Sequence, residues 1–272
     1  MYWLEFLISA IVIIFSGIFL TKYADQLSDE LNLGKVWIGI ILLGFVTSLP
    51  EAITSLVSII SLGANDLAVG NLLGSNNFNP ILIVVMDVMY RQGSLTNVIH
   101  ANRSHKAAAT FSIVLVGIVI ADILLSFPAL MLGPISLSTS GVAIAVVYIL
   151  GMRKLAGLNQ EGAGRDTHIN ASARPKGRMA GLIVRLLLST AVIIGGAMWL
   201  AKSADIIARE TGLGGTFFGS IFLAFVTSLP EMVVSLSALK FGSLDLAIGN
   251  IFGSNMTNMF IVSICSVFYR GG

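Results

Sequence analysis

Runs of apolar residues, each long enough to cross a membrane, alternate with polar connections along the whole chain. The apolar runs lie at 3–22, 36–61, 66–90, 107–125, 130–151, 179–201, 214–239 and 244–268. About 18 consecutive apolar residues are enough for a helix to span the hydrocarbon core of a bilayer. The pattern therefore predicts an all-α polytopic membrane protein with about eight transmembrane helices.

Two parts of the chain repeat each other within this pattern. Residues 45–51 read FVTSLPE, and the same letters return at 225–231. Likewise, the letters GSN at 74–76 return at 253–255. Between the copies, 152–178 is polar and rich in Gly, Arg, Asn and Ala, which is typical of a linker. We therefore predict a first repeat at 1–151 with five transmembrane helices, a linker at 152–178, and a second, apparently shortened repeat at 179–272 with three.

The number of helices sets the orientation of the second repeat. Five is odd, so the second repeat enters the membrane with the opposite orientation, and the predicted architecture is an inverted-repeat transporter bundle. Lys and Arg are enriched in cytoplasmic loops, and in this chain they gather on the side of the 152–178 linker. We therefore expect an integral protein of the plasma (inner) membrane, with its N-terminus outside and its linker in the cytoplasm.

Composition agrees with a membrane environment and excludes several functions. Charged residues make up 11% of the chain, against roughly 25% in a soluble domain. The formal net charge is only +2 and the basic residues lie at helix ends, so no nucleic-acid partner is expected. Cys265 is the single cysteine and cannot form an internal disulfide. No nucleophile has an adjacent base, so we do not expect an enzyme.

Two glutamates lie near the middle of otherwise apolar runs. Glu51 and Glu231 have no basic residue in their own predicted helices, and an ionised carboxylate at such a depth costs at least about 3 kcal/mol unless something pairs with it. A bound cation would compensate both charges, and this is our functional hypothesis. The alternative is a protonated glutamate that is hydrogen-bonded inside the bundle.

The residues before each glutamate favour cation binding. Pro50 and Pro230 immediately precede the glutamates, and a proline inside a helix removes an amide donor and leaves a backbone carbonyl free. Hydroxyl groups share the glutamate face of each helix, because Thr47 and Thr227 lie four residues before the glutamates. Calcium and sodium prefer such mixtures of carboxylate, hydroxyl, amide and carbonyl oxygens.

The next predicted helix of each repeat carries a polar stripe. Asparagine and serine recur there at steps of four residues, which places them on one helix face, at Asn71, Ser75, Asn79 and again at Asn250, Ser254, Asn258. Small residues beside the stripe, such as Gly74 and Gly253, favour close helix packing. The stripe either supplies amide and hydroxyl ligands or hydrogen-bonds only with itself.

Paired TSLPE and GSNxxxN segments in inverted halves resemble the alpha repeats of the calcium/cation antiporter superfamily, sodium/calcium exchanger branch. The resemblance covers both halves and implies a set of ion ligands: the side chains of Thr47, Ser48, Glu51, Ser75, Asn79, Thr227, Ser228, Glu231, Ser254 and Asn258, and the backbone carbonyls of Gly44 and Ala224. It also shows two departures. Many sodium/calcium exchangers have an aspartate in place of Asn258, and family members usually have ten helices, so this chain is expected to be a fragment or a shortened member.

The predicted function is a secondary active antiporter that exchanges Ca2+ for Na+ by alternating access at a midplane oxygen-ligand site. Both ions would bind as transported substrates, so no cofactor is expected, and the partners are these ions and the lipid bilayer. The alternatives are a proton- or other-cation-coupled divalent exchanger and a passive cation channel. His100, His105 and His168 fall in predicted cytoplasmic loops, which argues against a proton relay at the midplane.

Overall fold

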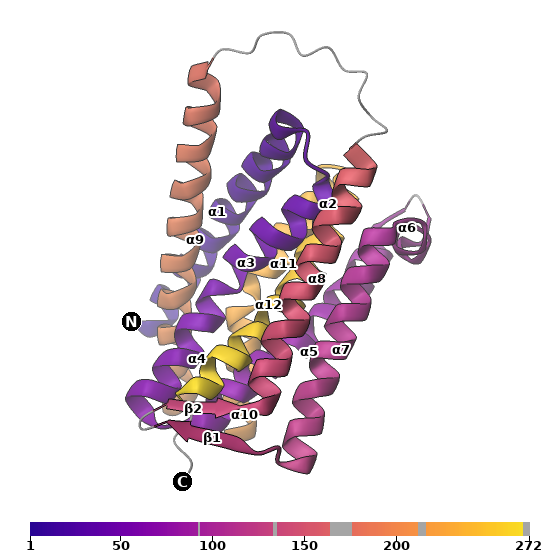
Figure 1. Cartoon of the computed structure of the whole chain (residues 1–272). Helices are drawn as coiled ribbons and strands as arrows, with labels where there is room; N and C mark the ends of the chain where they lie inside the picture. Colours follow the sequence, from indigo (N-terminus) through magenta and orange to yellow (C-terminus); the bar gives the residue numbers. More distant parts are fainter. Residues whose placement is uncertain (92, 133–134, 164–175, 212–215, 269–272) are drawn as a thin grey trace.

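The computed structural model describes residues 1–91, 93–132, 135–163, 176–211 and 216–268. Long helices form a bundle, and a two-stranded hairpin lies at one end of it (Figure 1). The first half contains α1 (Tyr2–Leu31), α2 (Lys35–Trp37), the π-helical segment η1 (Ile38–Leu43), α3 (Gly44–Thr47), α4 (Leu49–Leu62), α5 (Asn65–Met89), α6 (Leu95–Ala101), α7 (Arg103–Leu125), β1 (Ala129–Leu132), β2 (Ile135–Ser138) and α8 (Thr139–Ala163). The second half contains α9 (Lys176–Glu210), α10 (Thr216–Thr227), α11 (Leu229–Lys240) and α12 (Leu244–Val267).

The described helices suit a membrane. Six helical segments are long and apolar enough to cross a bilayer, and the bent pair α10 and α11 makes a seventh. Large apolar side chains cover the outside of the bundle, with Val88 80%, Leu124 75% and Ile113 73% exposed. Such a surface is stable in lipid and not in water. The chain is an integral membrane protein, and the all-α transporter bundle is the predicted fold class.

Helix α12 was predicted as a further spanning helix, and it occupies the centre of the bundle instead of its surface. It has 24 residues and carries one of the two polar stripes, and it is not among the helices that are apolar enough to span by composition alone. Nearly all of its side chains are buried against η1, α3, α5, α7, α8 and α11. Its polar residues therefore face protein and not lipid.

The structure differs from several predicted boundaries, since α1 continues to Leu31 and α9 to Glu210, beyond the apolar runs 3–22 and 179–201. The apolar run 130–151 starts as a hairpin, in which Ala129 pairs with Ser138, and α8 begins only at Thr139. A short apolar run with β-branched residues fits a strand as well as a helix, so the pattern could not separate them. In addition, α8 continues to Ala163 and α9 begins at Lys176, so helices extend into both ends of the predicted linker.

The two halves are arranged with opposite orientations. Helix α9 is the first helix of the second repeat, as α1 is the first helix of the first repeat. It packs along α1 and runs in the opposite direction (Figure 1). Helices α5 and α12, which carry the two polar stripes, also pack against each other. This arrangement brings the residues that are identical in the two repeats together at the centre of the bundle, as an inverted repeat requires.

Glycines allow the closest helix contact of this centre. A Cβ atom on Gly44 of α3 would lie 2.6 Å from the backbone carbon of Gly253 in α12. Another on Gly39 would lie 2.6 Å from the backbone oxygen of Leu246. Real side chains do not fit at such distances, so glycine is required where η1 and α3 cross α12.

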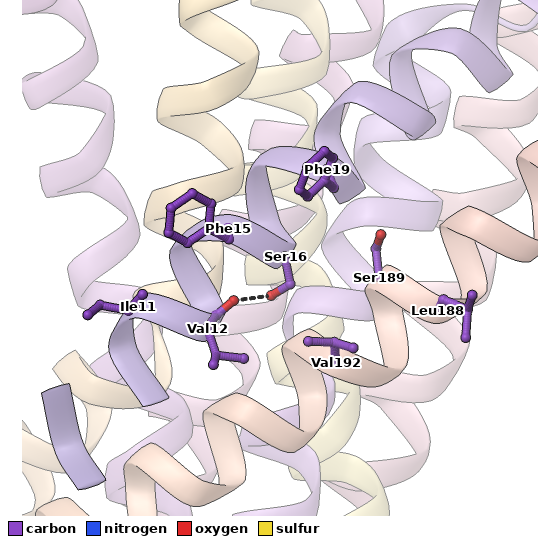
Figure 2. Close-up of a pocket in the computed structure, with 8 residues that line it drawn as sticks. All are labelled: Ile11, Val12, Phe15, Ser16, Phe19, Leu188, Ser189 and Val192. Atoms are coloured by element: carbon purple, nitrogen blue, oxygen red, sulfur yellow. Dashed lines mark hydrogen bonds between the residues drawn. The ribbon is translucent and has the colours of Figure 1, made fainter. Parts of the chain in front are cut away.

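A shallow apolar groove separates α1 and α9 on the outside of the bundle (Figure 2). It has a volume of ≈ 380 Å³ and is lined by Ile11, Val12, Phe15, Ser16, Phe19, Leu188, Ser189 and Val192. The hydroxyl of Ser16 bonds within its own helix, to the carbonyl of Val12 at 2.7 Å. The groove contains no residue of the repeated motifs, so the candidate site lies elsewhere.

Candidate functional site

Each TSLPE segment breaks its helix at the serine. Helix α3 ends at Thr47 and α4 begins at Leu49, and in the second half α10 ends at Thr227 and α11 begins at Leu229. The prolines lie in the first turn of the new helices, where a missing amide hydrogen costs little. Helices α10 and α11 meet at a bend of 44°. The predicted broken helices are confirmed, and each places a helix end inside the bundle.

The motif side chains of both halves converge into one buried cluster. They come from α3, α4, α5, α10, α11, α12 and the two serines at the breaks. The cluster is enclosed, because 0% of the residue surface is exposed at Thr47, Ser48, Glu51, Asn71, Ser75, Asn79, Thr227, Ser228, Glu231, Asn250, Ser254 and Asn258. Twelve polar residues packed together in an apolar bundle need partners for their polar atoms.

Both glutamates accept a hydrogen bond through one oxygen. Ser75 donates to Oε1 of Glu51 at 3.1 Å, and Ser48 donates to Oε1 of Glu231 at 3.5 Å. The hydroxyls of Ser75 and Ser228 are also hydrogen-bonded to each other. These bonds join the α3–α4 break to α11 and α5 to the α10–α11 break. The two glutamates therefore belong to one site and not to two separate ones.

Each threonine of the motifs is tied to the asparagine of the opposite half. Thr47 Oγ1 lies 3.2 Å from Oδ1 of Asn250 and 3.1 Å from Oγ of Ser254. Thr227 Oγ1 donates to Oδ1 of Asn71 at 3.1 Å. These crossed bonds hold the broken helix of one half against the polar stripe of the other.

The last asparagine of each stripe is anchored through its amide nitrogen. Asn79 donates from Nδ2 to Oδ1 of Asn255 at 2.7 Å, and Asn258 donates from Nδ2 to Oδ1 of Asn76 at 3.1 Å. Each pair joins α5 to α12 across the centre of the bundle. The amide oxygens of Asn79 and Asn258 take no part in these bonds.

Four buried oxygens of the cluster have no hydrogen-bond partner. They are Oε2 of Glu51, Oε2 of Glu231, Oδ1 of Asn79 and Oδ1 of Asn258, one carboxylate and one amide oxygen from each half. In the part of the chain that the structure describes, no ion pair reaches either glutamate. Leaving such acceptors unpaired costs about 1–3 kcal/mol each. Carboxylate and amide oxygens without partners are the kind of ligands that a hard cation binds.

The backbone carbonyls named by the resemblance lie in different settings. Gly44 O accepts a long bond of 3.4 Å from Ser254 Oγ, so it borders the cluster. Ala224 O accepts from the backbone nitrogen of Ser228 at 3.0 Å and from Thr227 Oγ1 at 3.3 Å. The structure thus brings the predicted side chains together, and their role as ligands stays a prediction.

The chemistry of these groups suits a hard cation. Carboxylate, amide, hydroxyl and carbonyl oxygens are the ligands that calcium and sodium prefer. Among the described residues, no three side chains of His, Cys, Asp or Glu gather where they could hold a metal ion. Two carboxylates supported by neutral oxygens are suited to an ion that binds and leaves.

Sequence reasoning missed four residues that support the cluster. Ser55 accepts from Asn71 Nδ2 at 3.2 Å, and Ser235 accepts from Asn250 Nδ2 at 2.9 Å. Asn76 and Asn255 hold the last asparagines of the stripes, as described above. All four are identical between the repeats, Ser55 with Ser235 and Asn76 with Asn255. A strict search for identities between the halves could have found them.

The prediction that His105 lies in a loop is wrong. His105 belongs to α7 and is fully buried, with Nε2 at 2.7 Å from Oδ1 of Asp245 at the start of α12. Asn102 also approaches Asp245, at 3.4 Å. This pair ties α7 to the first turn of α12.

Comparison with known proteins agrees with this geometry. Residues 1–152 and 181–271 match the family model of the sodium/calcium exchanger protein. The chain belongs to the sodium/calcium exchanger family. The predicted resemblance is thereby confirmed over both halves, and membership in this family makes the chain a membrane protein of the cation and calcium exchange class.

The chain is similar to individual relatives over different shares of its length. The inner membrane protein YrbG of Escherichia coli is 28% identical over 262 residues, which are 94% of this chain and 76% of the relative. The sodium/calcium exchanger MaX1 of Methanosarcina acetivorans is 38% identical over 97 residues, 35% of this chain and 28% of the relative. A solved structure of the sodium-calcium exchanger NCX_Mj has a TM-score of 0.72 at 20% identity, covers 98% of this chain and 82% of its own, and shows the same fold.

Proposed function

We propose that the protein is a secondary active antiporter that exchanges calcium for sodium at the buried oxygen cluster. The observation that carries this proposal is the set of four unpaired oxygens, supplied symmetrically by Glu51, Asn79, Glu231 and Asn258. Two carboxylates match the charge of one calcium or of two sodium ions. Membership in the sodium/calcium exchanger family and the likeness of MaX1 support the choice of these ions.

Shared ligands are what couple the two fluxes. Calcium and sodium would compete for the same two carboxylates, because Glu51 and Glu231 lie in one enclosed cluster. A site that is occupied by one ion excludes the other, so net movement of one ion requires movement of the other. A passive pore would use similar oxygens without this competition.

Access to the site alternates when α1 and α9 slide together across the motif helices. Helix α1 packs against η1 and α11, and α9 packs against α10, so this pair covers broken helices of both halves. One hydrogen bond crosses the contact between α1 and α11, from Thr21 Oγ1 to the backbone oxygen of Val234 at 3.3 Å, and it would break as the pair slides. The motif helices, which are cross-linked by the threonine and asparagine bonds, remain fixed.

The proposed function includes an orientation of the protein in the plasma membrane. We place the 152–178 segment in the cytoplasm and the N-terminus outside, in the plasma membrane, because basic residues gather on the linker side. The protein needs no cofactor, since calcium and sodium are its substrates, and it catalyses no covalent reaction.

The test is calcium transport in vesicles. The purified protein is reconstituted in sodium-loaded vesicles, which are diluted into sodium-free medium, and the uptake of radioactive calcium is measured. Uptake should require the outward sodium gradient and should be lost in Glu51→Gln and in Glu231→Gln. Glu210→Gln changes an exposed glutamate at the end of α9 and should transport like the wild type.

Other outcomes would decide against the proposal. Calcium uptake that follows the calcium gradient alone and does not depend on sodium would indicate a channel. Uptake that follows a proton gradient in the absence of sodium would indicate a proton-coupled exchanger. Retained uptake in both glutamine variants would show that the ions bind elsewhere.

A further inference from the structure

Asn76 and Asn255 lie in the cluster but are not among the proposed ion ligands. Each lies directly after the serine of a GSN segment, on α5 and α12 respectively, and each is almost completely buried, with 6% and 8% of its surface exposed. The amide oxygen of each is occupied, because it accepts the hydrogen bond from Asn258 or Asn79 of the opposite half. Each of these oxygens therefore has a hydrogen-bond partner, unlike the amide oxygens of Asn79 and Asn258.

We propose that Asn255 and Asn76 are positioning residues that fix the amide orientation of the ion ligands Asn79 and Asn258. The bond from Asn79 Nδ2 to Asn255 Oδ1, at 2.7 Å, determines which end of the Asn79 amide points away from its partner. The other end is the unpaired Oδ1. The same relationship holds between Asn258 and Asn76. This inference rests on the proposed function, since it assigns these oxygens to the transported cation.

Orientation matters because the two ends of an amide have opposite electrostatic character. An amide oxygen attracts a cation, whereas the NH2 group is a donor and repels it. The end torsion of asparagine is broad and has two-fold character, so an unanchored amide can present either end. An acceptor that holds the amide nitrogen removes this freedom before the ion binds. Binding then costs less side-chain conformational entropy.

The anchor is itself held in place. Asn76 donates from Nδ2 to the backbone oxygen of Asn255 at 3.2 Å, which links the two positioning residues across the contact between α5 and α12. This bond fixes the amide of Asn76, whose Oδ1 accepts from Asn258. A residue that only filled space would not require the directed amide bonds that both halves share, from Asn79 to Asn255 and from Asn258 to Asn76.

The first experiment measures calcium affinity in Asn255→Leu. This variant keeps the volume of the side chain but removes the acceptor for Asn79 Nδ2. The apparent KM for calcium in sodium-driven uptake should rise about tenfold, as expected for the loss of a buried polar partner. Asn77→Leu, on the exposed face of α5, is the matched control and should not change KM.

A double-mutant cycle separates positioning from a structural role. If Asn255 acts only through Asn79, the substitution Asn255→Leu should have no further effect on the KM in the Asn79→Ala background. The parallel cycle joins Asn76→Leu with Asn258→Ala. Additive effects in both cycles, or an unchanged KM in Asn255→Leu, would overturn the inference.

A second readout keeps the inference independent of the proposed exchange. Calcium-dependent thermal stabilisation of the purified protein in detergent reports binding without transport. The calcium concentration that gives half of the stabilisation should shift about tenfold in Asn255→Leu and not in Asn77→Leu. If wild-type vesicles show no sodium-driven uptake, the proposed function fails, while this titration still decides the role of Asn255.

Discussion

Thr47 and Asn250 belong to opposite halves of the chain, yet the threonine hydroxyl lies 3.2 Å from the asparagine amide oxygen inside a fully buried cluster. The symmetric contact joins Thr227 to Asn71 at 3.1 Å. Each broken helix is therefore fixed by the polar stripe of the other repeat. Both halves therefore build the cluster together, because the threonine of each half bonds to the asparagine of the other.

The first prediction concerns this cross-link. Thr47→Val keeps the shape of the side chain and removes the hydroxyl, so Asn250 loses a donor, and sodium-driven calcium uptake should fall at least about tenfold. Asn250→Leu should have a similar effect. The double variant should be little worse than either single variant, because both substitutions remove the same interaction. A fully additive loss would show that the two residues act independently.

The second prediction concerns binding at the glutamates, measured without transport. Calcium at 100 times its dissociation constant should stabilise the wild-type protein by roughly 2.7 kcal/mol, which thermal unfolding in detergent detects. Glu51→Gln should lose most of this stabilisation, because it removes one of two charges that face the ion. Glu231→Gln should behave in the same way. Equal stabilisation of the wild type and both variants by calcium would place the binding site elsewhere.

The parts of the site that the two repeats share could be predicted from the sequence alone. Pro50 and Pro230 predicted the helix breaks because proline lacks the amide hydrogen that a helix interior needs. The glutamates were recognisable because a carboxylate in an apolar run requires a compensating group. These are local effects, and they do not depend on which helices come into contact.

Other features depend on tertiary contacts that no local pattern contains. The bond between Asn79 and Asn255 exists only because α5 packs against α12. His105 is buried because Asp245 begins the neighbouring helix. The hairpin at Ala129–Leu132 and Ile135–Ser138 was predicted as helix, since apolar length does not distinguish the two when the run is short.

The third prediction tests the close crossing of α3 and α12. In Gly44→Ala the new Cβ would lie 2.6 Å from the backbone carbon of Gly253, so the helices must separate or distort. Such overpacking typically costs about 1–3 kcal/mol, and it would also move the Gly44 carbonyl away from Ser254. Both the unfolding temperature and calcium uptake should fall.

The equivalent position of the second half provides a control for this substitution. Residue 224 is already alanine, and Ala224→Gly removes a methyl group without creating a clash. It should retain most of the uptake, with a loss of stability of about 1 kcal/mol from the helix propensity of glycine. A normal unfolding temperature in Gly44→Ala would contradict the requirement for glycine at this crossing.

The fourth prediction tests the sliding of α1 and α9 as a pair. Gly17 of α1 lies against Val233 of α11, because a Cβ atom on Gly17 would be 2.7 Å from Cγ1 of Val233. Cysteines at these two positions are close enough for a disulfide, in a background where the buried Cys265 is replaced by alanine. Oxidation would attach α1 to a motif helix, and it should stop sodium-driven calcium uptake until a reductant is added.

A second pair of cysteines distinguishes sliding of the pair from any other loss of motion. A Cβ atom on Gly196 of α9 would lie 3.2 Å from Cγ1 of Val12 in α1, so Val12→Cys with Gly196→Cys should also form a disulfide. This bond joins the two sliding helices to each other and leaves them free to move across α11. Uptake should therefore survive oxidation in this variant. If both disulfides stopped uptake, α1 and α9 would have to move relative to each other, and if neither did, access would alternate by the motion of other helices.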